Sequence, residues 1–287
     1  MILVCVSCKP THSEQSTSGS ASEQVSYIEN KGSDTMVNLA LAWAEAYQAL
    51  HPDIRVSVTG GGSGTGLASL SNGTVNIANA SREIKSEEIE LAQAAGFTPY
   101  EVAVAQDAIA VIVNPENPVS ELTLDQISRI YLGDITNWQE VGGEDRPIVR
   151  LSRETNSGTH VYFLEAVVRK GNKEDKRIFS PETLLLPSSE GIISEVRDNP
   201  NAIGYDGLGY IIPEVKTIAI APEEGEPYVQ ASVETVTDGT YPISRDLYMY
   251  FQDEPQGVIK KYLEWILSPD AQAIVSELGF VPVRVKE

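Results

Sequence analysis

Cysteine is almost absent from this sequence. The chain has 287 residues and two cysteines, Cys5 and Cys8, which both lie within its first eight residues. The remainder therefore has no disulfide to stabilise a fold and no thiol for catalysis or metal binding. An apolar core has to hold it together, and a hydrophobic content of 41% is ample for a chain of this length.

Positive charge is scarce as well. Lys and Arg number 21 against 41 Asp and Glu, which gives a formal net charge of −20. Sequence-independent nucleic-acid binding needs clustered Lys and Arg, and the sequence has no basic patch, so we expect no nucleic-acid partner. The acidic surface indicates solubility and weak self-repulsion. We expect a monomer that uses no cofactor and no metal.

Long apolar stretches are missing too, because nothing beyond the N-terminus approaches the roughly 20 apolar residues of a membrane span. The start, 1-MILVCVSC-8, has the form of a lipoprotein cleavage site with Cys8 as the acylated residue. The Ser-rich segment 9–24 then predicts a tether, so we expect an extracytoplasmic lipoprotein anchored to the membrane. No Lys or Arg precedes Cys8 and the apolar run is short, which indicates a truncated N-terminus or a mis-assigned start. A chance apolar start is the alternative.

From residue 25 onward, strand-like and helix-like patterns alternate. Alternation of this kind predicts an α/β fold in which helices cover mostly parallel sheets. Two extended runs, 101–115 and 241–251, are long enough to leave one domain and return to it. We therefore predict two domains with a binding cleft between them: residues 25–107 plus 246–287 as lobe I, and residues 108–245 as lobe II. The other predicted elements are strands at 25–30, 54–59, 75–81, 148–152, 183–187, 202–205 and 215–221, and helices at 39–50, 67–73, 86–96 with Ser86 as N-cap, 123–133, 158–171, 256–268 and 270–279.

Four short segments place small and hydroxyl-bearing residues immediately before a predicted helix. The free N–H groups and the dipole of a helix N-terminus bind anions without a formal positive charge. Glycine lets the backbone approach closely, and hydroxyl groups add donors. One such segment also fits an ordinary helix cap, but four in one chain predict an anion site. We call them the anion turns: 32-GSDTM-36, 60-GGGSGTG-66, 80-ASRE-83 and 153-RETNSGT-159.

Two anion turns contain an arginine. Arg82 follows Ser81, and Arg153 lies four residues before Ser157. A guanidinium group engages a tetrahedral oxyanion through two parallel hydrogen bonds, although an ion pair in an acidic protein is the alternative for each arginine. A nucleotide ligand is not expected, because the glycine segment has no Lys for a P-loop and lacks the G-x-G-x-x-G spacing.

With these residues in hand, the chain closely resembles the phosphate-binding proteins of bacterial phosphate ABC transporters. The similarity covers nearly all of Val25 to Val285 and includes 107-DAIAVIVNPENP-118, 122-LTLDQISRIYLGDITNW-138 and 279-GFVPV-283. The resemblance implies a two-lobed, periplasmic-binding-protein-like (type II) fold, with a mixed sheet flanked by helices in each lobe and two crossover strands at the hinge. It also implies high-affinity binding of inorganic phosphate and delivery to a membrane permease. Carried over by motif, the implied phosphate contacts are Ser33, Asp34, Thr35, Ser63, Gly64, Thr65, Ser81, Arg82, Arg153, Ser157, Gly158 and Thr159.

The sequence departs from well-known members of that family directly after Ser81. Those members have Asp there, which accepts the proton of hydrogen phosphate and helps to exclude sulfate, whereas this chain has Arg82. We expect Arg82 to tighten binding of any dianion, so selectivity for phosphate needs another acceptor. Asp34 is the first candidate and Asp107 the second. The alternative roles are a helix-capping carboxylate for Asp34 and a hinge hydrogen bond for Asp107.

Two other functions stay open at this point. The same fold would also suit another oxyanion such as sulfate, molybdate or arsenate. A phosphate-hydrolysing enzyme would use Ser157 or Ser63 as nucleophile, and His160 lies one helical turn from Ser157. No supporting acidic partner is apparent for such a pair, so we expect a binding protein rather than an enzyme.

Overall fold

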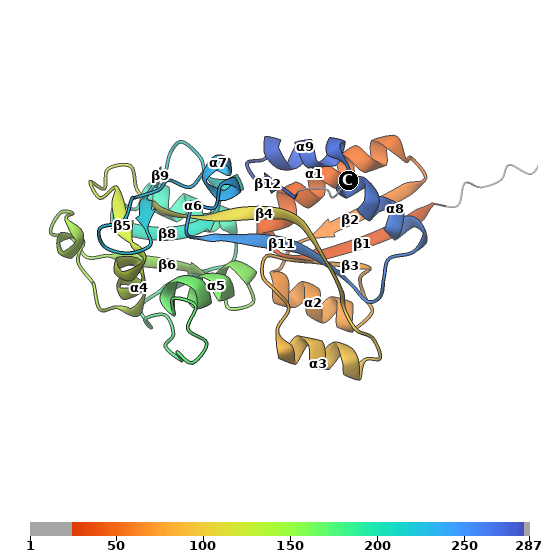
Figure 1. The fold of residues 1–287 in the computed structure, drawn as a ribbon, viewed down its shortest axis with the longest axis horizontal. Helices are drawn as coiled ribbons and strands as arrows, with labels where there is room; N and C mark the ends of the chain where they lie inside the picture. Colours follow the sequence, from red (N-terminus) through yellow and green to blue (C-terminus); the bar gives the residue numbers. More distant parts are fainter. Residues whose placement is uncertain (1–24, 284–287) are drawn as a thin grey trace, which may run out of the picture.

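The computed structural model describes residues 25–283, so the predicted lipidation at Cys8 and the predicted tether lie outside the described residues. Within residues 25–283 the chain forms one mixed sheet of ten strands and a separate pair of strands, with helices on the faces of the large sheet (Figure 1). The main path of the large sheet has the order β2-β1-β3-β11-β4-β8-β6-β7. None of the helices in this part of the chain is both long and apolar enough to span a bilayer.

One half of the large sheet is built from the N-terminal part of the chain, to which the last helices return (Figure 1). Its strand β1 lies between β2 and β3 and is parallel to both, as alternating strands and helices predict. The elements are β1 (Ser26–Gly32), η1 (Asp34–Met36), α1 (Val37–Leu50), β2 (Ile54–Thr59), α2 (Ser63–Ser71), β3 (Ile77–Ala80), α3 (Ser86–Ala94), α8 (Gly257–Ile266), α9 (Pro269–Glu277) and β12 (Val281–Pro282).

The other half is built from the middle of the chain. Strand β6 is parallel to β7 and β8, and the small separate sheet pairs β5 with β10. The elements are β5 (Glu121–Thr123), α4 (Leu124–Leu132), η2 (Trp138–Val141), β6 (Val149–Arg153), α5 (Gly158–Phe163), the π-helical η3 (Leu164–Val168), β7 (Leu184–Leu186), α6 (Ser189–Asp198), β8 (Ala202–Gly207), η4 (Leu208–Tyr210), β9 (Lys216–Thr217), β10 (Ala219–Ala221) and α7 (Val233–Thr237).

Two long strands join the halves, β4 (Tyr100–Val113) and β11 (Ser244–Phe251). Strand β4 pairs with β11 and β12 along its first part and with β8 and β9 along its second part. Its antiparallel register with β11 shifts between Leu247 and Tyr248, and near the end of this ladder Arg245 lies opposite Asp107. Figure 1 shows both strands running from one half of the molecule into the other.

Side chains of β4 enter the core on both faces of the sheet. Because successive residues of a strand point to opposite faces, Val111 and Val113 join one core with helix α4, whereas Ala110 and Ile112 join another with helix α6. In the N-terminal half, Trp43 of α1 belongs to a core that also contains residues of α8 and α9. The sheet is therefore covered on both faces, which explains the long apolar runs of its strands.

The structure differs from the predicted elements in several places. The predicted helix 158–171 is split into α5 and the π-helical η3, and the predicted strand 215–221 is split because β9 pairs with β4 while β10 pairs with β5. Ser86 is the first residue of α3 rather than its N-cap. The N-cap is Lys85, whose N–H donates to a carboxylate oxygen of Glu88 at 2.9 Å. Helix α6 was not predicted.

Candidate anion-binding site

The four anion turns each follow the carboxyl end of a strand. Three of them follow β1, β2 and β3, which are parallel, and the fourth follows β6 of the other half. Ligands of open α/β sheets bind outside the carboxyl ends of parallel strands. The strand arrangement therefore brings segments that are up to about 120 residues apart in sequence to one place.

Three serine hydroxyls from three anion turns form one buried cluster. The Ser33 hydroxyl lies 2.9 Å from that of Ser81, and the Ser63 hydroxyl lies 3.4 Å from Ser81 and accepts the Ser81 N–H at 3.1 Å. Gly158 of the fourth turn abuts the cluster, since a Cβ atom placed on it would lie 2.3 Å from the Ser63 Oγ and 2.5 Å from the Ser81 Oγ. Any side chain at this position would displace these two hydroxyls, so glycine allows the two halves to approach closely with the hydroxyls in place.

Further contacts connect the two halves across the same region. The hydroxyls of Thr35 and Thr159 are 2.8 Å apart. The Gly64 N–H donates to the carbonyl of Asn156 at 3.1 Å, and the Asn156 amide donates to the carbonyl of Gly61 at 2.9 Å. The anion turns of the two halves are thus in direct contact, in a closed arrangement.

Arg153 is the most enclosed arginine of the site and is 1% exposed. It donates to a carboxylate oxygen of Asp34 at 2.8 Å and to the hydroxyl of Ser189 at 2.8 Å, and it lies 3.6 Å from the carboxylate of Asp206. Within residues 25–283 its Nε–H has no acceptor. Arg82, Arg245 and Arg150, the last of which pairs with Glu182, also have a buried Nε–H without an acceptor in this part of the chain.

Arg82 makes a different set of contacts. Both terminal nitrogens donate to the carboxylate of Glu88, at 2.8 and 2.7 Å, and one of them also donates to the carbonyl of Glu83. The residue is 6% exposed, so this is a buried, bidentate pair rather than a surface one. Arg82 therefore adjoins the serine cluster through Ser81 while Glu88 compensates its charge.

This pairing leads to a prediction for Glu88. We expect Glu88→Gln to tighten sulfate and phosphate binding threefold or more, because the positive charge of Arg82 would no longer be compensated. Isothermal titration calorimetry at low salt measures the change. Glu87→Gln is the matched control, since Glu87 is an exposed neighbour on α3 and the variant has the same net charge. Equal affinities of the two variants would contradict the effect of the Arg82–Glu88 pair.

A third buried arginine, Arg245 on β11, was not predicted as a site residue. It is 7% exposed, and it donates to the carboxylate of Asp107 at 3.0 Å and to the hydroxyl of Thr159 at 3.0 Å. Asp107 is fully buried and also accepts the N–H of Leu208 at 3.1 Å. Two more residues, Ser189 and Asp206, were not predicted as site residues, and they adjoin the site because both contact Arg153.

Carboxylates outnumber arginines at this site. Three guanidinium groups face four carboxylates, those of Asp34, Glu88, Asp107 and Asp206. Burial raises the pKa of Asp107 to about 6, although Arg245 acts to lower it. Burial likewise raises the pKa of Asp206, against the opposing effect of Arg153. Both groups therefore take up protons more readily than an exposed carboxylate does.

The remaining predicted residues occupy less central positions. The Ser157 hydroxyl caps α5 by accepting the N–H groups of Thr159 and His160. The side chain of Thr65 lies beside Gly61, at the partly exposed edge of the glycine turn. The His160 side chain turns away from Ser157, because its Nδ1 lies 2.8 Å from the carbonyl of Arg153 and 3.0 Å from the Ser152 hydroxyl. Burial lowers the pKa of His160.

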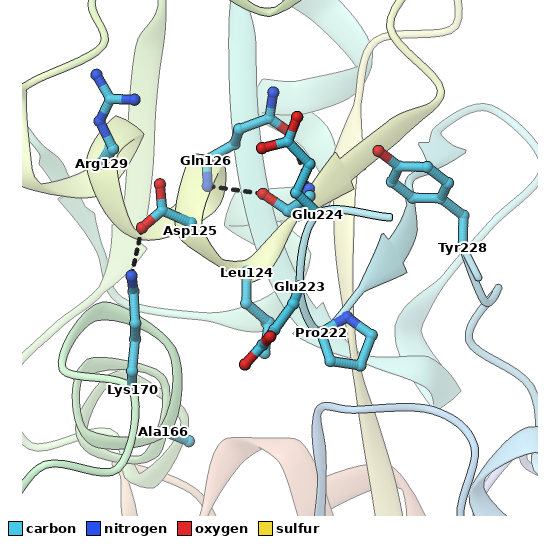
Figure 2. A pocket seen from close by; sticks show the side chains of 11 residues that line it. Leu124, Asp125, Gln126, Arg129, Ala166, Lys170, Pro222, Glu223, Glu224 and Tyr228 are labelled. Atoms are coloured by element: carbon cyan, nitrogen blue, oxygen red, sulfur yellow. Dashed lines mark hydrogen bonds and ion pairs between the residues drawn. The ribbon is translucent and has the colours of Figure 1, made fainter. Parts of the chain in front are cut away.

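A separate groove of about 730 Å³ lies on the middle part of the chain, between the start of α4 and the loop after β10. It contains none of the predicted site residues. Figure 2 shows Lys170 directed at Asp125, with which it forms an ion pair, and Glu223 and Glu224 beside the same groove. Lys170 is already paired with Asp125, and the groove includes none of the anion turns, so the anion turns remain the candidate site.

Comparison with known proteins gives the class to which this fold and site belong. A family model described as a PBP superfamily domain matches residues 14–270. The phosphate-binding protein PstS of Pseudomonas aeruginosa strain PAO1 is 33% identical over 276 residues, covering 90% of this chain and 84% of that protein. PstS of Bacillus subtilis is 32% identical over 253 residues, covering 88% and 79%. The chain therefore belongs to the PstS family of phosphate-binding proteins within the PBP superfamily.

Solved structures agree with this assignment. A putative phosphate ABC transporter substrate-binding protein from Clostridium perfringens, with bound phosphate, has a TM-score of 0.80 and 34% identity, covering 90% of this chain and all of that one. An ABC-type phosphate transport receptor from Vibrio cholerae has a TM-score of 0.70 and 29% identity over 90% of this chain. The predicted α/β, two-lobed, periplasmic-binding-protein-like fold is confirmed.

Proposed function

We propose that this protein captures inorganic phosphate between its two lobes, outside the cytoplasm, and delivers it to a permease of the ABC type. The main support is the cluster of hydroxyls from Ser33, Ser63 and Ser81, which meets Gly158 of the opposite lobe. Hydroxyl donors, helix N-termini and buried arginines at one interlobe contact suit a small, fully enclosed oxyanion. The names of the relatives support phosphate as that anion.

The proposed contacts are the residues of the anion turns already named, with Arg153 as the main cation. Micromolar or tighter capture corresponds to about −8 kcal/mol or better. A buried dianion with unpaired oxygens would cost more than that, so nearly every phosphate oxygen has to be hydrogen-bonded. We place the lobe boundary at residues 107/108 and 245/246, where Asp107 and Arg245 lie opposite each other on β4 and β11.

Asp34 remains our candidate for the acceptor of the phosphate proton. It is 21% exposed, whereas Asp107 is fully buried between Arg245 and the Leu208 N–H. Both carboxylates already have two partners, since Asp34 accepts from the Gly61 N–H at 2.8 Å and from Arg153 at 2.8 Å. The greater exposure of Asp34, at the edge of the site, is what favours it, because its remaining lone pairs can face a ligand. An acceptor carboxylate favours hydrogen phosphate, which has a proton to donate, over sulfate, which has none at neutral pH.

Attachment and assembly form the remaining part of the proposal. The lipoprotein-like start with Cys8 supports a lipid anchor, and the Ser-rich segment supports a tether that leaves the lobes free to reach a permease. The net charge of −20 supports a monomer in solution. Mass spectrometry of the native N-terminus would test acylation of Cys8.

Calorimetry with phosphate and sulfate tests the proposed function. We expect phosphate to bind with a dissociation constant of about 1 μM or lower, and sulfate to bind at least tenfold more weakly. Asp34→Asn is expected to reduce the ratio of phosphate to sulfate affinity, since a neutral amide oxygen accepts a hydrogen bond less strongly than a carboxylate oxygen does.

Three outcomes would contradict this proposal. Absence of phosphate binding, or equal affinity for sulfate, would shift the assignment to another oxyanion. Turnover of p-nitrophenyl phosphate would indicate the hydrolytic alternative instead. We expect no turnover, because His160 contacts Ser152 and the Arg153 carbonyl rather than the Ser157 hydroxyl.

A further inference from the structure

Arg245 touches three of the four anion turns at once. Its Nη1 donates to the carbonyl of Ser81 at 2.8 Å, and its Nη2 lies 3.0 Å from the Thr159 hydroxyl and 3.4 Å from that of Thr35. Thr35 and Ser81 belong to lobe I, whereas Thr159 belongs to lobe II. One side chain on a crossing strand therefore contacts both walls of the proposed site.

A guanidinium group can only donate hydrogen bonds. The two hydrogens of Nη2 go to Asp107 and to the Thr159 hydroxyl oxygen, both at 3.0 Å, and the Thr35 oxygen at 3.4 Å has at most a share in one of them. The Thr159 oxygen therefore accepts from Arg245, so its own hydrogen points elsewhere. Because these two oxygens are 2.8 Å apart, one hydroxyl donates to the other and the second hydrogen stays available. Arg245 thus turns the threonine pair into a donor, which is what an anion requires.

The position of Arg245 is itself fixed from several sides. Asp107, its cross-strand neighbour, accepts from Nη2 at 3.0 Å and is held in turn by the Leu208 N–H. The guanidinium carbon lies 5.5 Å from the centre of the Tyr162 ring, within the range of a cation–π contact. A group held in this way loses little conformational entropy when a ligand binds.

We propose that Arg245 is a positioning residue of the anion site, which directs the hydroxyls of Thr35 and Thr159 towards the ligand when the lobes are closed. This inference rests on the proposed phosphate-binding function, and it assigns a role to a residue outside the four anion turns. Arg245 acts through the threonines, so its effect on affinity depends on the presence of their hydroxyls.

A double-mutant cycle in phosphate affinity tests this role. We expect Arg245→Gln and Thr159→Val each to weaken phosphate binding at least tenfold. The double variant should bind phosphate at most about threefold more weakly than whichever single variant has the lower affinity. Such non-additivity reports coupling between the two side chains. Arg129→Gln is the charge-matched control, because Arg129 is exposed on α4, and it should change affinity less than threefold.

The results distinguish failure of the Arg245 role from failure of the proposed phosphate binding. Additive losses in the cycle, or an Arg245→Gln loss below threefold, would overturn the positioning role while leaving phosphate binding by the wild type intact. Absence of phosphate binding by the wild type would overturn the proposed function and this role together. Arg245→Lys serves in the same cycle where Arg245→Gln does not fold, since a lysine keeps the charge but cannot reach Ser81, Asp107 and both threonines at once.

Discussion

Replacing Arg153 with glutamine is expected to weaken phosphate binding by at least about 30-fold. Truncating one member of a buried, hydrogen-bonded charge pair costs about 2–5 kcal/mol, and about 1.4 kcal/mol corresponds to a factor of ten. Arg153 is 1% exposed and is the proposed main cation for the phosphate. Calorimetry with phosphate measures the loss directly.

The variant will also be less stable, because Asp206 is fully buried and would lose its nearest cation. Arg150→Gln provides the control for this effect. Arg150 lies on the same strand, is 3% exposed and pairs with Glu182, away from the anion turns. We expect Arg150→Gln to bind phosphate within threefold of the wild type, and a loss below tenfold for Arg153→Gln would exclude Arg153 as the main cation.

Alanine at Gly158 is expected to reduce phosphate affinity by at least about 100-fold without unfolding the protein. The added methyl group would lie 2.3 Å from the Ser63 Oγ and 2.5 Å from the Ser81 Oγ, so both hydroxyls have to turn away or the lobes have to stay apart. Two lost hydrogen bonds to a charged ligand cost roughly 3–6 kcal/mol in total. Stability should be maintained, because Gly158 is the first residue of α5 and alanine favours helix.

Calorimetry measures the affinity of this variant, and small-angle scattering with and without phosphate measures closure. Gly191→Ala is the matched control, because its methyl group would meet its nearest neighbour, the Ser188 Oγ, at an ordinary van der Waals distance of 3.4 Å. It should bind phosphate within threefold of the wild type. An unchanged affinity of Gly158→Ala would show that this close contact between the lobes is not part of the bound state.

The sequence predicted most of the fold because its strong signals are local. Strand β2 lies at the predicted residues 54–59, and the long run at 101–115 is indeed one strand that enters both halves of the sheet. The sequence did not predict helix α6 for two reasons. Its residues follow almost directly after the short strand β7, and Gly191 near its start lowers the helix propensity. Its serine N-terminus at 188–189 was a fifth segment of the type that defined the anion turns.

Arg245 and Asp206 were missed because their roles depend on contacts between distant strands. The sequence did contain an indication of the role of Arg245. Alternate residues of a strand face the same side of a sheet, so Arg245 faces the same side of β11 as the core residues Leu247, Met249 and Phe251. A charged residue in a core position needs buried partners. The pairing of Arg82 with Glu88 could not be predicted from the family's motifs, because it depends on how α3 packs after the third anion turn.

The two crossing strands have a consequence for how the lobes would separate. Strand β4 is hydrogen-bonded into both halves of the sheet, and its ladder with β11 contains a single irregularity, between Leu247 and Tyr248, of the kind that increases strand twist. We expect the lobes to open by twisting of these two strands, with the strand ladder kept. Opening the lobes would then mainly break contacts near the anion turns, including those of Arg245 with Ser81 and Thr159 and that of the Tyr210 hydroxyl with the Asp34 carbonyl. Release of phosphate would therefore require breaking these contacts between the lobes together with the hydrogen bonds to the bound ligand.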